Sequence, residues 1–427
     1  MRRVSVLSAA LALSASCLAA ERLIPDYAPY NAIPYDRAKI LARFNERNQD
    51  GTFNAVMELN TQNGEIPGWD WEAGRTTKKA MPSDVRAKKI ADLRFGMFIC
   101  WSFATFGGQE YVRGITDPEF FRATGCDTDQ WCEVARSAGM KYILFLTKHH
   151  DGFCLWDTRT TEFKVTNTKL GVDVLAQLKR SCDKYGLKLA LYFSEGDWHW
   201  GARTGWGRRA GRAAMANLKK AQLQELCTQY GPIEFFWMDH HAGDGGVSHV
   251  ETTKWVHQFQ PDCFAGYNHG QVSGRYMAGE VGKPGKLEDS AGAARLKRVA
   301  ARKMIAEQLG PRSAENKQEF DRRVRELVPT LKWEDVEEND LLLSEFTYPI
   351  LPTNHRGGAK WFYSLPKHDN LCHSAEKLYR DYVGACKFNN LFSLNVGPDY
   401  KGKIRAIDAK TLEQVGDWIR AGTRDQR

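Results

Sequence analysis

Apolar runs of strand length alternate with helical patterns along most of the chain, beginning near residue 93. The runs contain few polar positions, which is typical of strands buried on both faces, as in a parallel sheet. The strand candidates are Phe95–Trp101, Tyr142–Thr147, Leu187–Ser194, Ile233–Asp239, Cys263–Asn268, Leu341–Thr347 and Leu391–Val396. Apolar residues recur at helical spacing in Thr128–Ala138, Val172–Tyr185, Arg212–Tyr230, Glu376–Lys387 and Asp408–Arg420.

Seven strands in series with helices between several of them predict an α/β fold, a closed (β/α)8, TIM-like barrel. The eighth strand is weak in this pattern, and we expect it within the poorly patterned region 348–372. An open, doubly wound sheet is the alternative. No Gly-rich phosphate-binding fingerprint follows the first strand, which disfavours that alternative.

The first twenty residues have the pattern of an export signal. Arg2 and Arg3 precede the apolar stretch Val4–Leu13, which is too short to span a membrane, and small residues end the signal near Ala20. We therefore expect a signal peptide over 1–20 and a secreted or periplasmic protein. The match to a lipoprotein signal around Cys17 is poor, so we expect no lipid anchor.

Two further segments depart from the barrel pattern. Residues 21–85 are broken by prolines and are expected to wrap the outside of the main domain at 86–425. Residues 289–340 are rich in Arg, Lys and Glu, and a helical pattern in them is broken at Gly310-Pro311. This insertion is predicted to be a solvated helical excursion on the barrel rim. A lid over the active site is the alternative.

The composition argues against several protein classes. The net charge of +8 includes Arg2 and Arg3, and no basic stripe is interleaved with aromatic residues, so we expect no nucleic-acid binding. No segment after the signal has about 18 consecutive apolar residues, so none is expected to span a membrane. The cysteines are scattered without a Cys-x-x-Cys pair, which argues against a disulfide scaffold and a zinc site but leaves one disulfide open.

Polar residues stand where nearly every predicted strand ends. In a (β/α)8 barrel the carboxyl ends of the strands converge on one mouth, where active sites lie. One polar strand end is explained by a turn or a helix cap, but seven converging ends indicate a functional site. In chain order they are Cys100-Trp101, Lys148-His149-His150-Asp151, Ser194-Glu195, Asp239-His240-His241, Asn268-His269, Ser344-Glu345 and Asn395.

Histidine pairs at two of these ends raise the question of a metal. Adjacent residues on an extended segment point in opposite directions, so we expect His149 and His150 not to share one ion. The first strand also lacks the His-x-His motif that many metal-dependent barrel hydrolases use. We therefore expect no metal, and contact with sugar hydroxyls for the histidine pair.

Carboxylates supply the candidate chemistry. Asp239 follows the apolar run Ile233–Met238, where a carboxylate is costly unless it is paired or used; a turn cap is the structural alternative. Glycoside hydrolysis needs two carboxylates, and the spacing leaves Glu280, Glu288 and Glu345 open as the second. Aromatic rings that suit stacking on sugars crowd the same loops: Trp101, Tyr111, Trp156, Trp198, Trp200, Trp206 and Trp237.

At these motifs the sequence resembles glycoside hydrolase family 29, the α-L-fucosidases, from about Leu93 to Trp418. The matching stretches are Tyr142–Asp157, Leu189–Ser194 with Asp197-Trp198-His199, Ile233–Asp239, and Leu394–Pro398. The resemblance implies a retaining exo-glycosidase that needs no cofactor, and we expect a single catalytic domain. Its implied partners are fucosylated or related oligosaccharides and polysaccharides.

Position by position, the resemblance implies that Asp239 is the nucleophile. Gly279-Glu280 resembles the acid/base position of the branch with stricter linkage preference, and Ser344-Glu345-Phe346 that of the broad-specificity branch; we favour Glu280. The implied sugar-binding residues are Glu110, Tyr111, His149, His150, Tyr192 and Trp237. The strand-end positions add Cys100, Trp101 and His269 as candidate substrate contacts, and Arg275 is a further candidate.

Two departures from the family pattern qualify this expectation. Cys100-Trp101-Ser102 stands where the family usually has a His-bearing motif that contacts the sugar, and a thiol is a poor hydrogen-bond partner. A related sugar such as L-galactose is therefore an alternative substrate, and a non-catalytic carbohydrate-binding protein is a further one. The chain also ends soon after Trp418, so we expect no C-terminal β-sandwich.

Overall fold

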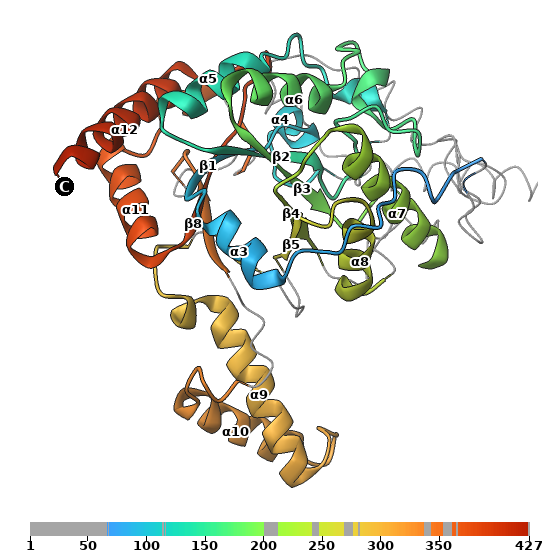
Figure 1. Cartoon of the computed structure of the whole chain (residues 1–427), viewed down its shortest axis with the longest axis vertical. Coiled ribbons are helices and arrows are strands. Elements are labelled where there is room, and N and C mark those ends of the chain that lie inside the picture. Colours follow the sequence, from blue (N-terminus) through green and yellow to red (C-terminus); the bar gives the residue numbers. More distant parts are fainter. Residues whose placement is uncertain are drawn as a thin grey trace, which may run out of the picture.

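The computed structural model describes residues 66–425, except 67, 113–114, 116, 200–211, 241–246, 269–275, 281, 337–342, 353–360 and 364–365. Eight parallel strands form one curled sheet in the order β5-β4-β3-β2-β1-β8-β7-β6 (Figure 1). The strands are β1 (Phe95–Ile99), β2 (Tyr142–Lys148), β3 (Lys188–Ser194), β4 (Phe235–Asp239), β5 (Phe264–Tyr267), β6 (Tyr276–Glu280), β7 (Leu343–Pro349) and β8 (Leu391–Val396). The seven strands predicted from apolar runs are all present.

The position predicted for the eighth strand is wrong. The additional strand is β6, which lies before the predicted sixth strand and not within 348–372. Its sequence, Tyr-Met-Ala-Gly-Glu, is short and contains a glycine and a carboxylate, so it lacks the apolar run of its neighbours. Parallel pairing with β7, from Tyr276 opposite Leu343 to Glu280 opposite Thr347, defines it as a strand.

The sheet curls from β5 round to β6, and these two strands are its ends. Among the described residues, no hydrogen-bonded pairing joins β5 to β6. The structure therefore shows a curled parallel α/β sheet, and closure of the complete barrel stays a prediction.

Helices cover the outer face of this sheet and confirm the helical patterns closely (Figure 1). Asp127 and Asp173 cap the first turns of α5 and α6 by accepting hydrogen bonds from Gln130 N and Ala176 N. Such caps satisfy backbone donors that have no partner inside the helix. The helices are α3 (Ser83–Ala91), α4 (Phe103–Gly107), α5 (Thr128–Ser137), α6 (Val174–Tyr185), α7 (Arg212–Gln229), α8 (His249–Phe259), α11 (Ala375–Phe388) and α12 (Ala406–Asp425).

The charged insertion forms a helical hairpin that projects away from the sheet (Figure 1). It consists of α9 (Ala291–Leu309) and α10 (Lys317–Leu327), and α9 ends at the predicted Gly310-Pro311 break. The two helices bury a small core of their own that includes Ile305 and Phe320. The hairpin is thus held together by its own apolar contacts.

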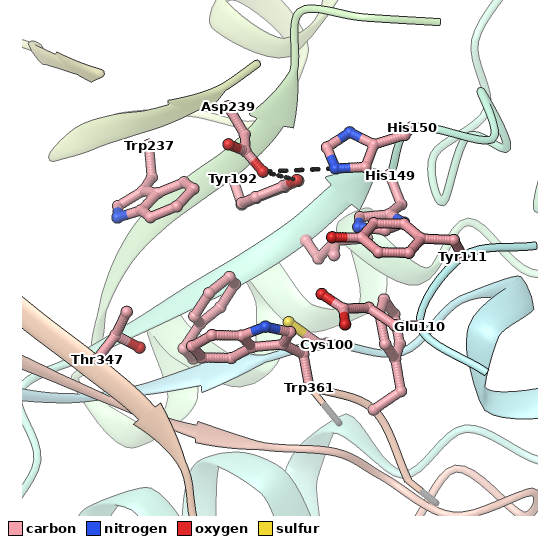
Figure 2. A pocket seen from close by; sticks show the side chains of 13 residues that line it. Cys100, Glu110, Tyr111, His149, His150, Tyr192, Trp237, Asp239, Thr347 and Trp361 are labelled. Carbon is pink, nitrogen blue, oxygen red and sulfur yellow. Dashed lines mark hydrogen bonds and ion pairs between the residues drawn. The ribbon is translucent and has the colours of Figure 1, made fainter. Parts of the chain in front are cut away.

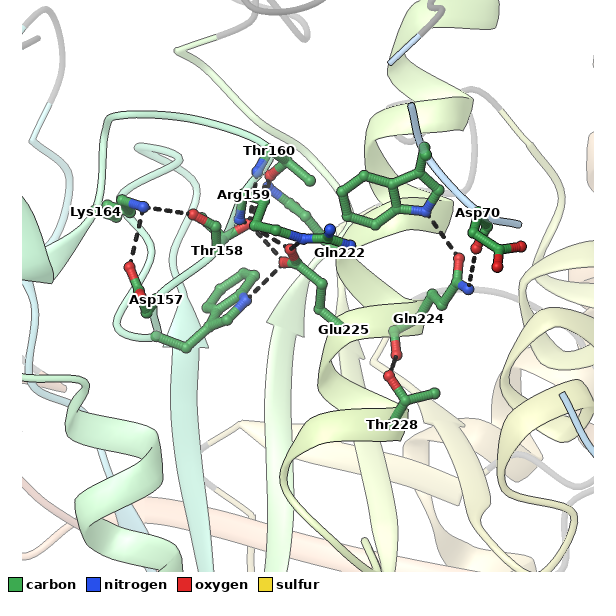
Figure 3. A network of polar contacts seen from close by, with 12 residues as sticks. Asp70, Asp157, Thr158, Arg159, Thr160, Lys164, Gln222, Gln224, Glu225 and Thr228 are labelled. Atoms are coloured by element: carbon green, nitrogen blue, oxygen red, sulfur yellow. Dashed lines mark hydrogen bonds and ion pairs between the residues drawn. The ribbon is translucent and has the colours of Figure 1, made fainter. Parts of the chain in front are cut away.

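Polar contacts of two α7 side chains attach two other segments to this helix (Figure 3). The Glu225 carboxylate accepts hydrogen bonds from Trp156 Nε1 at 3.0 Å, Thr158 Oγ1 at 2.6 Å and Arg159 N at 2.8 Å. These contacts fix the loop that follows β2. Gln224 Nε2 donates to Asp70 O at 2.8 Å, which attaches this part of the N-terminal segment to α7; the wrapping expected of residues 21–85 stays a prediction.

Two further expectations concern cysteines and membranes. The nine described cysteines are free, and the Sγ atoms of Cys132 and Cys182 lie 3.9 Å apart between α5 and α6. No helix in the described part of the chain has the length and apolar character needed to cross a membrane.

Candidate active site

The carboxyl ends of the strands bring most of the predicted site residues into one pocket (Figure 2). In Figure 2, Asp239, Tyr192 and His150 lie on one side of the pocket, and Glu110 and Trp361 lie on the other. The pocket is lined by Phe98, Cys100, Glu110, Tyr111, Leu146, His149, His150, Tyr192, Trp237, Asp239, Thr347, Trp361 and Phe362. No residue of the α9–α10 hairpin is among them.

Asp239 is the last residue of β4, and its carboxylate is held by three hydrogen bonds. Tyr192 Oη donates to Oδ2 at 2.7 Å, and Asn268 Nδ2 and the backbone N–H of His240 donate to Oδ1, each at 2.9 Å. His150 Nε2 lies 3.6 Å from Oδ2. These donors come from three neighbouring strand ends, so the sheet itself orients this carboxylate into the pocket.

Both His149 and His150 line the pocket, with ring centroids 4.1 Å apart. The expectation that the two side chains point in opposite directions is wrong. β2 ends at Lys148, and its pairing with β3 shifts register between Leu146 and Lys148, so the histidines stand on a turn where strand alternation no longer applies. Burial, followed by the neighbouring His150, lowers the pKa of His149 well below its usual value and favours the neutral ring.

The described residues contain no group of three or more His, Cys, Asp or Glu side chains arranged to hold a metal ion. The two rings of the histidine pair therefore have no third ligand within that part of the chain.

Cys100 and Trp101 lie in different environments. The Cys100 thiol is buried in the pocket, and burial raises its pKa, so it stays protonated. The Trp101 ring packs edge-on against Phe121 and Trp131 instead, and its Nε1 donates to Asp399 O at 2.9 Å. The structure thus brings Cys100 to the site but not Trp101, which is a core residue.

Glu110 and Tyr111 reach the pocket from the segment after α4. Tyr111 is 46% exposed, and its ring stacks near His149 and His150 at centroid distances of 6.2 and 6.0 Å. Tyr111 therefore forms part of the rim, where one face of its ring remains accessible to solvent or to a bound sugar.

The three candidates for the second carboxylate differ in position. Glu345 is only 2% exposed and does not line the pocket; its Oε2 accepts a 3.4 Å hydrogen bond from Trp237 Nε1. Glu280 ends β6 opposite Thr347, a lining residue, and its side chain lies outside the described part of the structure. Glu288 is exposed on a 3-10 turn (Leu287–Asp289), and the pocket does not include it.

Several site residues were missed in the sequence, and others lie outside the described residues. His269, Arg275, Trp200 and Trp206 belong to the second group. The missed lining residues are Phe98, Leu146, Thr347, Trp361 and Phe362. The Trp-Phe-Tyr cluster that begins at Trp361 was an available signal, because three aromatic residues within a segment without strand or helix pattern suggest a binding wall.

Comparison with known proteins gives one consistent family. The family model described as Alpha-L-fucosidase matches residues 104–423. Alpha-L-fucosidase 1 of Arabidopsis thaliana is 27% identical over 329 residues, which is 75% of this chain and 57% of that protein. Human plasma alpha-L-fucosidase is 22% identical over 359 residues, 77% of this chain and 66% of that protein. The chain thus spans a little over half the length of the first of these relatives.

Solved structures show the same fold. Alpha-L-fucosidase isoenzyme 1 from Paenibacillus thiaminolyticus superposes with a TM-score of 0.59 at 22% identity, covering 80% of this chain and 77% of that one. An alpha-L-fucosidase from Lactobacillus casei in complex with its α-L-fucose product gives a TM-score of 0.54 at 18% identity, covering 79% and 99%. Because the family model matches most of this chain, the chain belongs to the α-L-fucosidase family, glycoside hydrolase family 29.

Proposed function

We propose that this protein is an exported, retaining exo-glycosidase that releases α-L-fucose from fucosylated glycans. The observation that carries the proposal is the Asp239 carboxylate, oriented by three hydrogen bonds at the end of β4 within a pocket of histidine and aromatic side chains. A carboxylate oriented in this way is suited to attack at a sugar's anomeric carbon.

In the proposed mechanism, a carboxylate oxygen of Asp239 forms a bond to the anomeric carbon as the bond to the leaving-group oxygen breaks. A second carboxylic acid donates its proton to the departing oxygen. The same residue, now ionised, takes a proton from water, and that water hydrolyses the glycosyl ester. The anomeric configuration is inverted twice and is therefore retained.

We assign the acid/base role to Glu280 in preference to Glu345. Register supports this choice, because Glu280 pairs with the lining residue Thr347, whereas Glu345 pairs with Ala278, two positions earlier along the strands. The Glu345 carboxylate also already accepts a hydrogen bond from Trp237. A retaining enzyme requires the two carboxyl groups to lie about 5–5.5 Å apart when substrate is bound.

The apolar part of the pocket favours a deoxy sugar. Phe98, Leu146 and Phe362 supply lining surface without a hydrogen-bonding side chain, which suits the methyl group of fucose. Cys100 and Thr347 are the observations that favour the second candidate, a related sugar such as L-galactose, because their polar groups lie in the same pocket.

Two further proposals concern the N-terminal signal and the closure of the sheet. Residues 1–20 direct export to the periplasm or the medium, as their charged start and apolar stretch indicate. The sheet closes between β5 and β6 into a complete barrel, which the strand order supports because these two strands are its ends.

The function is tested with purified protein and a panel of aryl glycosides that includes the α-L-fucoside and the α-L-galactoside. We expect turnover of the α-L-fucoside, loss of several orders of magnitude in Asp239→Ala, and partial rescue by azide, which attacks in place of the missing carboxylate. Glu288→Ala is the matched control and should keep full activity. Retained activity in Asp239→Ala would contradict the proposal, and turnover of the galactoside alone would support the second candidate.

A further inference from the structure

Two buried hydrogen bonds lie behind His150, and the other side of its ring faces the nucleophile. Ser194, the last residue of β3, is fully buried; its Oγ lies 2.8 Å from His150 Nδ1 and donates to the carbonyl oxygen of Gly196 at 2.7 Å. The other ring nitrogen of His150, Nε2, is 3.6 Å from Asp239 Oδ2. The backbone of His150 is also fixed, since its carbonyl accepts a 2.8 Å hydrogen bond from the N–H of Trp198.

The single hydroxyl proton of Ser194 determines which ring nitrogen of His150 is protonated. A serine hydroxyl has one proton to donate, whereas a carbonyl oxygen can only accept. If Ser194 turned its proton to His150, its oxygen would face the Gly196 carbonyl oxygen at 2.7 Å with no proton between them. The proton therefore lies on the carbonyl side, and His150 Nδ1 must be the donor to Ser194.

We propose that Ser194 is a positioning residue that holds His150 as the Nδ1–H tautomer and so directs Nε2 to the nucleophile. The tautomer of a histidine is set by the hydrogen bond that its other nitrogen makes. In the neutral ring Nε2 then presents a lone pair to the pocket, able to accept from a substrate hydroxyl. In the protonated ring it presents a proton to Asp239.

The opposite tautomer would place a permanent donor at this position. A sugar hydroxyl would then meet a donor at His150 instead of an acceptor, so the hydrogen bonding beside the anomeric centre would reverse. Ser194 thus determines what the pocket offers to a hydroxyl next to Asp239. The tautomer assignment stands on geometry alone, whereas its effect on turnover rests on the proposed function.

Other titratable groups surround this ring and belong to any test that varies pH. The His149 ring lies tilted beside that of His150 at a centroid distance of 4.1 Å, and the His240 ring meets it edge-on at 4.3 Å. Tyr111 lies at 6.0 Å, and Asp239 faces Nε2. The test therefore measures the protonation of the two ring nitrogens of His150 directly, and does not rely on a pH profile alone.

The tautomer is measured by 15N-histidine labelling and long-range 1H–15N correlation spectra, with His150→Gln identifying the signals of this ring. At pH 8.5 the unchanged protein should show a protonated Nδ1 and an unprotonated Nε2. Ser194→Ala should shift the ring toward Nε2–H, and Ser194→Thr, which keeps the hydroxyl, should retain Nδ1–H. An Nε2–H tautomer in the unchanged protein, or the same tautomer in Ser194→Ala, would overturn the proposal.

Kinetics give the second readout, with Ser181→Ala as the matched control. Ser181 is also buried and linked by two hydrogen bonds, to Thr128 Oγ1 at 2.8 Å and Asp129 Oδ1 at 2.6 Å, but it lies on α6 away from the pocket. Loss of one hydrogen bond predicts about a tenfold fall in kcat/KM for Ser194→Ala. Ser194→Thr should restore most of it, and Ser181→Ala should change only the melting temperature. Equal effects of Ser194→Ala and Ser181→Ala on kcat/KM would refute the claim that Ser194 affects turnover through His150. A protein without glycosidase activity would refute the proposed function, and the spectra would still decide the tautomer.

Discussion

Lys219 on α7 is the cation of a buried ion pair that lies behind the nucleophile. Its Nζ contacts Glu195 Oε1 and donates to Thr252 Oγ1 at 2.6 Å; the two charged side chains are 2% and 0% exposed. Glu195 Oε2 lies 2.9 Å from His249 Nε2 on α8. The backbone N–H of Glu195 donates to the carbonyl of Asp239 at 2.9 Å, so the pair holds the end of β3 against the end of β4.

Lys219→Met keeps the length of the side chain and removes the charge. The Glu195 carboxylate would then be ionised where water does not reach it, with His249 as its remaining partner. Removing one member of a buried pair costs about 3–5 kcal/mol. At roughly 2 °C per kcal/mol for a large domain, the melting temperature should fall by about 6–10 °C.

Thermal unfolding followed by circular dichroism measures this effect, and Lys220→Met is the control. Lys220 is the next residue on the same helix, is partly exposed, and lies 4.9 Å from the centre of the Trp71 ring, so its removal should cost at most about 1 kcal/mol. The double variant Lys219→Met/Glu195→Gln should recover much of the loss, because no ionised carboxylate remains buried. Equal shifts for Lys219→Met and Lys220→Met would refute the reasoning, as would a double variant that is less stable than Lys219→Met.

The remaining predictions concern the pocket. Cys100→His should raise kcat/KM for the α-L-fucoside by up to about tenfold, the worth of one hydrogen bond; a fall would show that the pocket is built around the thiol. Glu280→Ala should slow substrates with poor leaving groups roughly a hundredfold or more beyond activated aryl glycosides, and if Glu345→Ala alone does so, the two roles are exchanged. Burial raises the pKa of Asp151 to about 7. Between about pH 4 and 7 the folded protein therefore binds more protons than the unfolded chain. The stability of the folded protein consequently falls as the pH rises through that window. Asp151→Asn should therefore flatten the dependence of melting temperature on pH and raise that temperature at pH 8; identical profiles would contradict this. Activity should survive dialysis against EDTA, and a loss reversed by zinc would point to a metal.

The sequence alone was sufficient to predict the strands and helices whose own residues show a clear apolar pattern. Strands buried on both faces need uniform apolar runs, and amphipathic helices need a 3.6-residue period. Seven strands and the helices α5, α6, α7, α11 and α12 were therefore visible in the chain, whereas α3, α4 and α8 were not predicted. Asp239 was visible for the same reason, because a carboxylate that ends a buried strand stands out from its neighbours.

Tertiary structure decided those features that depend on contacts with residues distant in the sequence. The strand β6 has no apolar run and exists through its pairing with β7. Whether a side chain at a strand end enters the pocket depends on where the strand stops pairing with its neighbours. Cys100 enters the pocket, whereas Trp101 turns into the core. Both His149 and His150 enter because β2 ends just before them. Trp361 joins the pocket from a segment without any periodic pattern. Local sequence determines the secondary structure that a segment prefers. Contacts with residues far away in the chain determine which of its side chains enter the pocket.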